Sequence, residues 1–338
     1  MRRSTLSWLR FLAGLTITAA CLWLTLRHIL FDEVARVAQT LRWPWLALAL
    51  ASLAAGYAAR IHRWWWTLQL CNPTVPLRSC AWPLLAGFAV NNVVPFRAGD
   101  ALRVVGFRRE LDMPVAQVLG SLFIERILDL TVLLAFFLVG ISGITDKGIP
   151  VAYLHAAVLA VGATAVGWLL LLWAGDHLEA LLIRICHHEF WHGSSLGIAA
   201  EQHVRRLFVA LNVVRVRGTL LKLLAMSVVV WSCEGGVFAA VAICLHYEGK
   251  ALGPWFALSA GSLATMIPSS PGYIGTFDFF TISGFTAYGT REAAAAAMTL
   301  TVHIVLWLPI TVAGLSYLLL VHLRGRGGRY VADPAQRR

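Results

Sequence analysis

Long uninterrupted apolar segments constrain this chain more than any other feature of its sequence. A helix needs about 20 predominantly apolar residues to cross a bilayer. Six segments of the 338-residue chain meet that length, at Trp8–Leu26, Trp43–Ala59, Pro114–Gly140, Val151–Ala174, Leu220–His246 and Ala293–Leu320. Hydrophobic residues make up 59% of the chain and charged residues 13%, which is about half the charged share of a soluble domain. The sequence therefore predicts an all-α polytopic membrane protein with about six full spans, and excludes an ordinary cytosolic enzyme.

Two further apolar stretches, 81–94 and 254–267, are too short to cross. Short apolar segments that are broken by Pro and Gly are typical of re-entrant hairpins. We therefore predict re-entrant elements at about 81–99 and 254–288. Their turns contain Asn92, Pro95 and Gly99 in the first element and Pro268, Pro271 and Gly272 in the second. Since 273–289 is mostly apolar, hydropathy alone also allows a count of seven or eight helices.

The charges between these segments predict the orientation. The net charge is +11, and the basic residues form short runs between apolar segments. This is the positive-inside pattern of a membrane protein, and no stretch forms a soluble basic domain that would bind nucleic acid. Arg2 and Arg3 place the N-terminus in the cytoplasm, and the basic tail at 324–338 places the C-terminus there. The segment after Ala59, with Arg60 and Arg63, is interpreted as a basic loop.

These assignments give both halves of the chain the same order: span, span, re-entrant element, span. Three spans is an odd number, so the second copy is predicted to be inverted. The first repeat covers 1–140, and the fourth span lies in 141–174. The connection at 175–219 contains an amphipathic pattern at Ser195–Val214, which predicts a helix on the cytoplasmic surface. The rest of the second repeat covers 220–323.

Ionisable residues inside the predicted spans are the candidate functional residues, because at mid-bilayer each costs about 2.5–3.5 kcal/mol on insertion scales. Glu125 and Asp129 share a helix face, and Arg126 is spaced to pair with Asp129. The other candidates are Glu234 and His303 in later spans, and Arg97, Asp100, Arg103 and Asp278 near the two turns.

The balance of charge among these candidates predicts which headgroup they would accept. Two arginines, Arg97 and Arg126, stand against four carboxylates, those of Glu125, Asp129, Glu234 and Asp278. A site that is net negative by two suits a cationic or zwitterionic head, or protons. Two other interpretations stay open. The charges in the third span can form ion pairs that serve only to hold helices together, and His303 can be a hydrogen-bonded packing residue.

No pattern predicts catalysis, a metal site or a cofactor. The chain has no Gly-rich phosphate loop and no HExxH motif. His187, His188 and His192 lack the further ligands that would complete a metal site. We therefore expect a protein that is not an enzyme and that holds neither a metal nor a cofactor.

The segment NNVVPFRAGDALRVVGFRRELDMPVAQVLGSLFIERILDL resembles the signature of the lysylphosphatidylglycerol synthase/flippase transmembrane-region family. Its matching positions are Asn92, Pro95, Arg97, Gly99, Asp100, Arg103, Glu125, Arg126 and Asp129. A second feature matches at Pro271-Gly272, Asp278 and Trp307-Leu308-Pro309. The chain departs from the family at Asp278, where Glu is commoner, and at His303, where relatives often carry Arg. Fused members carry a soluble aminoacyl-transfer domain after the last span. This chain ends shortly after that span, so no synthase activity is expected.

The resemblance implies a flippase-like lipid translocator in a bacterial inner membrane. In this interpretation Arg97 contacts the lipid phosphate, and Glu125, Arg126, Asp129 and Glu234 line the path of the head. The lipid can be a phospholipid, a hopanoid or a polyprenyl-linked lipid. Two alternatives remain: a membrane-embedded enzyme, or an accessory scaffold in the synthesis of lipids or polyprenyl-linked glycans. A second copy of the chain and a lipid-synthesis enzyme are the protein partners left open.

Overall fold

The computed structural model describes residues 41–94, 97–144, 151–172, 175–187, 195–266 and 270–323, and these ranges are built from helices without strands. The predicted all-α class is therefore confirmed over the described ranges. Several predictions lie outside them: the first span at 8–26, the turn prolines Pro95 and Pro268, and the tail at 324–338.

Three described helices are long and apolar enough to cross a membrane. They are α3 (Trp43–Gln69), α11 (Thr219–Cys244) and α14 (Glu292–Leu323). Helix α7 (Val115–Ser142) has 28 residues, but its charged residues keep it out of this group. Helix α8 (Val151–Leu172) bends by 71° into α9 (Gly175–Cys186), and the two together form a further candidate. Over the described residues, each predicted span after the first thus contains a long helix.

Shorter helices form two hairpins. In the first, α4 (Arg78–Val93) is followed by α5 (Ala98–Ala101), a π-helical turn at Leu102–Gly106 and α6 (Arg108–Leu111). In the second, α12 (Gly253–Ala264) and α13 (Thr276–Ala287) are joined through a 3₁₀ turn at Pro271–Tyr273 and pack on each other. Helices α12 and α13 have 12 residues each, or about 18 Å, too short for a hydrocarbon core of about 30 Å. Both elements that the sequence predicts to be hairpins fold back, and their entry into a membrane stays a prediction.

Glycines permit the close backbone contacts within these hairpins. A Cβ atom on Gly99 would lie 2.7 Å from the carbonyl carbon of Gly87 and 2.8 Å from Oδ1 of Asn91. In the second hairpin, a Cβ on Gly284 would lie 2.6 Å from Cα of Ala257. The arms of each hairpin therefore meet through backbone atoms, which fixes their separation.

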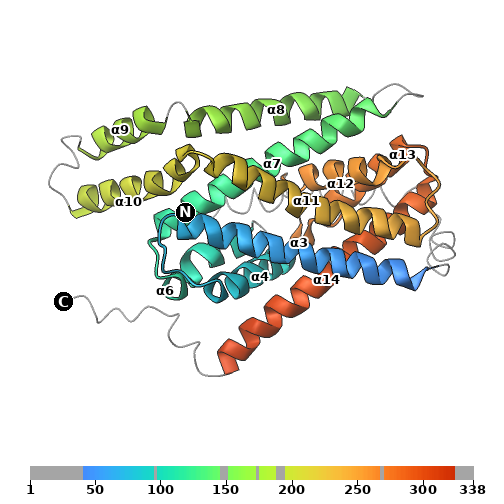
Figure 1. Cartoon of the computed structure of the whole chain (residues 1–338), viewed down its shortest axis with the longest axis horizontal. Helices are drawn as coiled ribbons and strands as arrows, with labels where there is room; N and C mark the ends of the chain where they lie inside the picture. The colour runs from blue at the N-terminus through green and yellow to red at the C-terminus, as the bar shows by residue number, and fades with distance from the viewer. Residues whose placement is uncertain are drawn as a thin grey trace, which may run out of the picture.

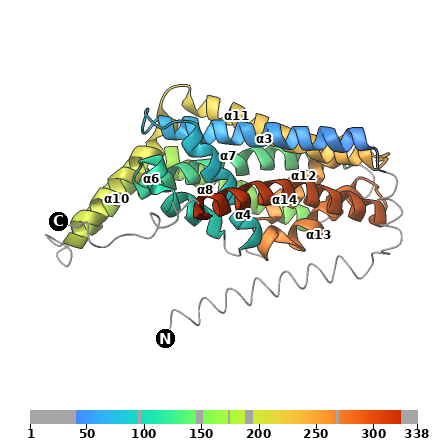
Figure 2. The same ribbon diagram turned by 90° about the horizontal axis from the view of Figure 1, so that it is seen from below.

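The helices pack in a reciprocal pattern (Figures 1 and 2). Helices α3 and α11 lie side by side and antiparallel, since the Arg42 N–H donates to the Cys244 carbonyl at 3.2 Å. Helix α4 of the first hairpin packs on α14 at the end of the second half. Its counterpart α12 packs on α7 at the end of the first half. This exchange of partners is consistent with an inverted repeat, and the repeat itself stays a prediction.

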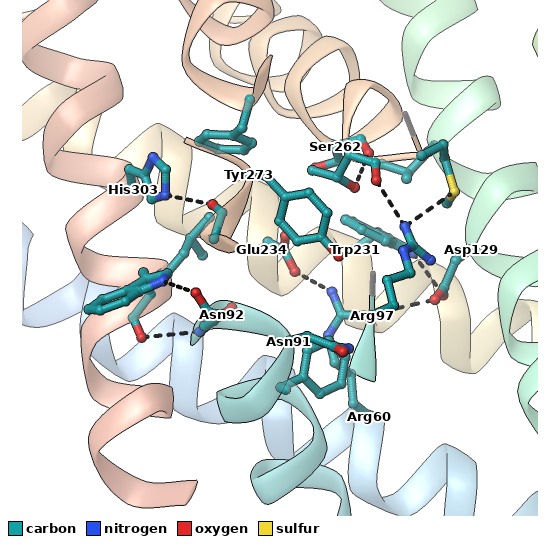
Figure 3. Close-up of a pocket in the computed structure, with 18 of the residues that line it drawn as sticks. Arg60, Asn91, Asn92, Arg97, Asp129, Trp231, Glu234, Ser262, Tyr273 and His303 are labelled. Carbon is teal, nitrogen blue, oxygen red and sulfur yellow. Dashed lines mark hydrogen bonds and ion pairs between the residues drawn. The ribbon is translucent and has the colours of Figure 1, made fainter. Parts of the chain in front are cut away.

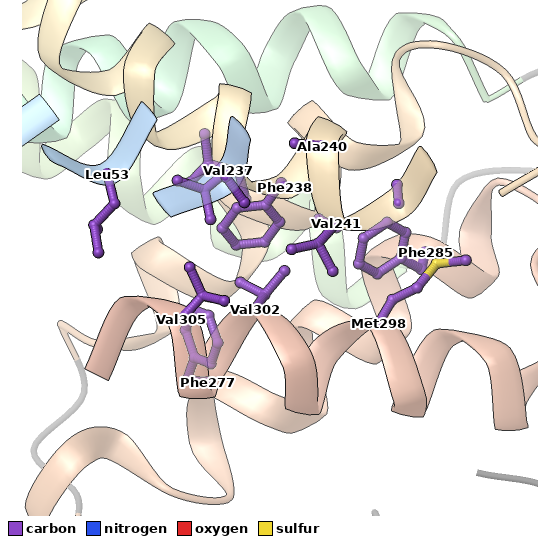
Figure 4. Close-up of a cluster of buried hydrophobic side chains, with 14 of the residues drawn as sticks. Leu53, Val237, Phe238, Ala240, Val241, Phe277, Phe285, Met298, Val302 and Val305 are labelled. Carbon is purple, nitrogen blue, oxygen red and sulfur yellow. The ribbon is translucent and has the colours of Figure 1, made fainter. Parts of the chain in front are cut away.

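The largest apolar core lies where α11, α13 and α14 meet (Figure 4). Val237, Phe238 and Val302 are fully buried there, and Leu53 joins them from α3. At one edge of the molecule (Figure 1), α8 and α10 (Ser195–Leu211) pack on α7, and α9 packs on α10. The helix predicted in the connecting segment is thus present, and a 3₁₀ turn at Asn212–Arg215 follows it.

Gly99→Ala is expected to destabilise the fold, because the added methyl group meets backbone atoms of Gly87 that have no room to move. Overpacking of this kind costs about 1–3 kcal/mol. The matched control is Gly162→Ala in α8, where a Cβ would meet nothing within 4 Å. Thermal unfolding of the purified protein in detergent should show a lower Tm for Gly99→Ala only. Equal Tm values for the two variants would contradict the close contact.

Candidate functional site

Four arginine–carboxylate pairs connect the helices at the centre of the molecule. Each pair joins residues far apart in the sequence, and each contains at least one residue that the sequence singles out. The pairs are Arg103–Glu125 (3.0 Å), Arg126–Asp100 (2.9 Å), Arg63–Asp129 (2.6 Å) and Arg60–Glu234.

The Arg103–Glu125 pair ties the first hairpin to α7. Both Arg103 Nη atoms donate to Glu125, at 3.0 and 3.3 Å, and the Arg103 side chain is completely buried. The Trp64 ring lies 4.2 Å from its guanidinium carbon. Trp64 is 1% exposed, so its ring packs against a buried cation.

Asp129 is the point at which α3, α7 and α11 meet. Its Oδ1 accepts from Arg63 at 2.6 Å and from the Trp231 ring nitrogen at 3.0 Å. Arg60 lies 4.0 Å from its other oxygen. The predicted Arg126–Asp129 pair is not made, because Arg126 reaches away from α7 to Asp100.

Arg60 and Arg63 are the principal residues that sequence reasoning missed. The predicted span ends at Ala59 and both arginines were interpreted as loop charges, but α3 continues to Gln69. Arg60 is 6% exposed and Arg63 is 2% exposed. Their burial is possible because Glu234 and Asp129 compensate the two charges. The spacing of three residues, which puts both guanidinium groups on one helix face, is the signal that could have found them.

The first hairpin turn is held by a short network around Asp100. Asn91 donates to Asp100 at 3.1 Å, and its amide oxygen accepts the Gly99 N–H at 2.8 Å. Arg126 donates to both oxygens of Asp100. The residue before the short helix, Arg97, has a φ of 53°, a left-handed conformation that is uncommon outside glycine.

A matching network holds the second hairpin to α14. Oδ2 of Asp278 accepts the Gly275 N–H at 2.9 Å, and Oδ1 lies 2.6 Å from Nδ1 of His303. The other ring nitrogen of His303 lies 3.1 Å from the Gly272 carbonyl. A carbonyl oxygen only accepts, so Nε2 must donate. The contact with Asp278 then requires one more proton, on Nδ1 or on the carboxyl group. The His303–Asp278 pair is therefore neutral as a unit.

The two hairpin turns approach each other along α14. Asn92 of the first hairpin donates to Thr311 at 2.8 Å, and the Trp307 ring nitrogen donates to the Asn92 carbonyl at 3.3 Å. A Cβ on Gly272 of the second hairpin would lie 2.8 Å from that same ring nitrogen. Glycine is required at 272 for this reason and because its φ is 66°.

A cavity of about 150 Å³ lies between the hairpin turns (Figure 3). Of the predicted residues, those that line it are Asn92, Arg97, Arg126, Asp129, Glu234, Gly272 and His303. Arg60, Tyr57 and Trp231 line it as well, without having been predicted. Four predicted charged residues do not line it. Asp100 and Asp278 bind the lining residues Arg126 and His303, and Arg103 and Glu125 pair with each other.

Comparison with known families agrees with this architecture. A family model described as the lysylphosphatidylglycerol synthase TM region matches residues 11–314. The chain belongs to this family. The match covers the greater part of the chain and both halves of the fold, so the predicted resemblance is confirmed. Together with the long apolar helices, it establishes a membrane protein with a lipid-related role. No match was found among curated proteins or among solved structures.

Asp129→Asn should strongly destabilise the protein, because it leaves the Arg63 cation buried without a carboxylate. Breaking a buried ion pair from one side costs about 3–5 kcal/mol. Asp176→Asn is the control, since Asp176 pairs with Arg215 but its side chain is 73% exposed. Unfolding of both variants in detergent should show a large loss of stability for Asp129→Asn and almost none for Asp176→Asn. Similar small losses in both would show that Asp129 does not hold the helices together.

Proposed function

We propose that the protein is a flippase-like lipid translocator that moves a polar headgroup through the central cavity. The observation that carries the proposal is this charged cavity, which lies between two helical hairpins inside an otherwise apolar membrane protein. Charged side chains within a membrane protein mark the paths of polar substrates when they line a wet cavity. Membership of a lipid-related membrane family supports the same conclusion.

The arrangement suggests how a head could cross while the acyl chains stay in the bilayer. The cavity walls come from both hairpins and from α3, α7, α11 and α14, so a head inside it touches both halves of the molecule. The ion pairs that tie each hairpin to its neighbouring long helix would let the hairpins move as rigid units. Rocking of one half against the other would then expose the cavity to alternate sides, as in transporters with inverted repeats.

The remaining features of the proposal concern location and partners. We place the protein in a bacterial inner membrane with both termini in the cytoplasm. Arg60 and Arg63 no longer count as loop charges, but Arg78 and Arg108 keep the first hairpin region basic. The substrate is a membrane lipid, and a second copy of the chain or a lipid-synthesis enzyme is the proposed protein partner. Translocation needs no bond cleavage, metal or cofactor.

The test is translocation in proteoliposomes. Vesicles with the purified protein should move lipids labelled on an acyl chain between leaflets, measured by reduction of outer-leaflet fluorophores, and protein-free vesicles should not. Arg126→Gln should lower the rate at least about tenfold, equivalent to about 1.4 kcal/mol, because Asp100 loses its cation and the first hairpin loosens. Arg205→Gln is the control, since Arg205 forms an exposed pair with Glu201 on α10.

Failure to move any lipid across a panel of phospholipids, hopanoids and polyprenyl phosphates, with folded protein in verified orientation, would contradict the proposal. A lipid that instead changes mass would favour the membrane-embedded enzyme. A stably copurifying synthesis enzyme would favour the scaffold. Full activity in folded Arg126→Gln protein would show that the first hairpin is not part of the translocation path.

A further inference from the structure

We propose that the cavity selects lipids whose headgroup carries a phosphate and no cationic amine, and that Arg97 is the side chain that binds the phosphate. The inference rests on the proposed function and narrows its substrate class. It reverses the expectation from the sequence, in which a net negative site suits a cationic or zwitterionic head.

The charge balance of the folded site gives the first argument. Asp100, Glu125, Asp129 and Glu234 each have an arginine partner, and Asp278 shares a proton with His303. Arg97 remains without a carboxylate among the described residues. The cavity lining has the same surplus, since it contains three arginines and two carboxylates. They are Arg60, Arg97, Arg126, Asp129 and Glu234. The site therefore carries one positive charge in excess, which a phosphodiester headgroup would neutralise.

The geometry of Arg97 gives the second argument. Its Nη2 donates to the Thr265 carbonyl at 3.0 Å and lies 3.7 Å from the Met266 sulfur. The Tyr273 ring centre lies 6.0 Å from its guanidinium carbon, and all three of these partners are uncharged. Arg97 thus reaches from the first hairpin to the second with its charge uncompensated (Figure 3). Its left-handed backbone, with φ of 53°, is a conformation that persists in folded proteins where the surrounding structure demands it, often at ligand sites.

The aromatic cluster beside Glu234 gives the third argument, because the chain's own arginine already occupies it. Quaternary and primary amines are commonly bound over aromatic faces. Here Trp231, Phe88 and Tyr57 surround Arg60, whose guanidinium carbon lies 4.6, 5.8 and 6.0 Å from the three ring centres. The chain's own arginine occupies the position that an ammonium group would take, and Glu234 is already paired with that arginine.

The experiment compares matched lipids in proteoliposomes. Phosphatidylglycerol, phosphatidylcholine and lysylphosphatidylglycerol, all with the same acyl-chain fluorophore, provide an anionic, a zwitterionic and a cationic head. Wild-type protein is expected to move phosphatidylglycerol about tenfold faster than the other two. Arg97→Gln should abolish this preference and slow phosphatidylglycerol about tenfold or more, because it removes the charged hydrogen-bond donor for the phosphate. Arg97→Lys should keep part of the preference, and the exposed Arg205→Gln all of it.

The outcomes separate this inference from the proposed function. Equal rates for the three lipids in wild-type protein would overturn the inference and leave a translocator, and this comparison needs no variant. An unchanged phosphatidylglycerol rate in folded Arg97→Gln protein would also overturn it. If no lipid moves, the proposed function itself fails. A last experiment measures the binding of inorganic phosphate. If phosphate binding depends on Arg97 and phosphatidylglycerol does not compete with it, the site binds a soluble anion and the inference that it selects a lipid is overturned.

Discussion

Ion pairing between arginine and carboxylate groups inside an apolar helical body is the interaction on which the rest of this structure depends. An uncompensated charge in such surroundings costs several kcal/mol, so each buried carboxylate needs a cation at close range. Asp129 shows the consequence most clearly, because α7 meets α3 through Arg63 and α11 through Trp231 at this one carboxylate. The pairs determine which helices touch, and the apolar core fills the space that they leave.

In each hairpin, an aspartate that follows the turn is held by a side chain of a long helix, but the two side chains differ in chemistry. Asp100 follows the first turn and is held by Arg126 of α7. Asp278 follows the second turn and is held by His303 of α14. The first acid is paired with a permanent cation, and the second shares a proton with a histidine. Because both acids are satisfied in this way, the properties of the cavity depend on the one arginine left over, Arg97, more than on the total number of charges in the region.

Several elements of the fold and site could be predicted from local patterns alone. The apolar lengths located α3, α11 and α14, and the short segments with Pro and Gly located both hairpins. The free-energy cost of placing an ionisable group in the membrane singled out five residues: Glu125, Arg126, Asp129, Glu234 and His303. The partners of these residues could not be predicted in the same way, since Arg63 and Asp129 lie 66 positions apart and helical spacing considers only neighbours on one helix. For that reason the expected Arg126–Asp129 pair was wrong.

The sequence by itself determined that this chain is an all-α membrane protein with charges that require compensation. Hydropathy and the cost of burying charge depend on residue type, so they can be read without a fold. Only the tertiary structure decided how the compensation is made, because an ion pair depends on distances between helices that are separate in sequence. When the buried Arg60, Arg63 and Arg103 are counted, the net charge of the site changes from minus two to plus one. That change of sign is the physical reason why the folded cavity suits an anionic head.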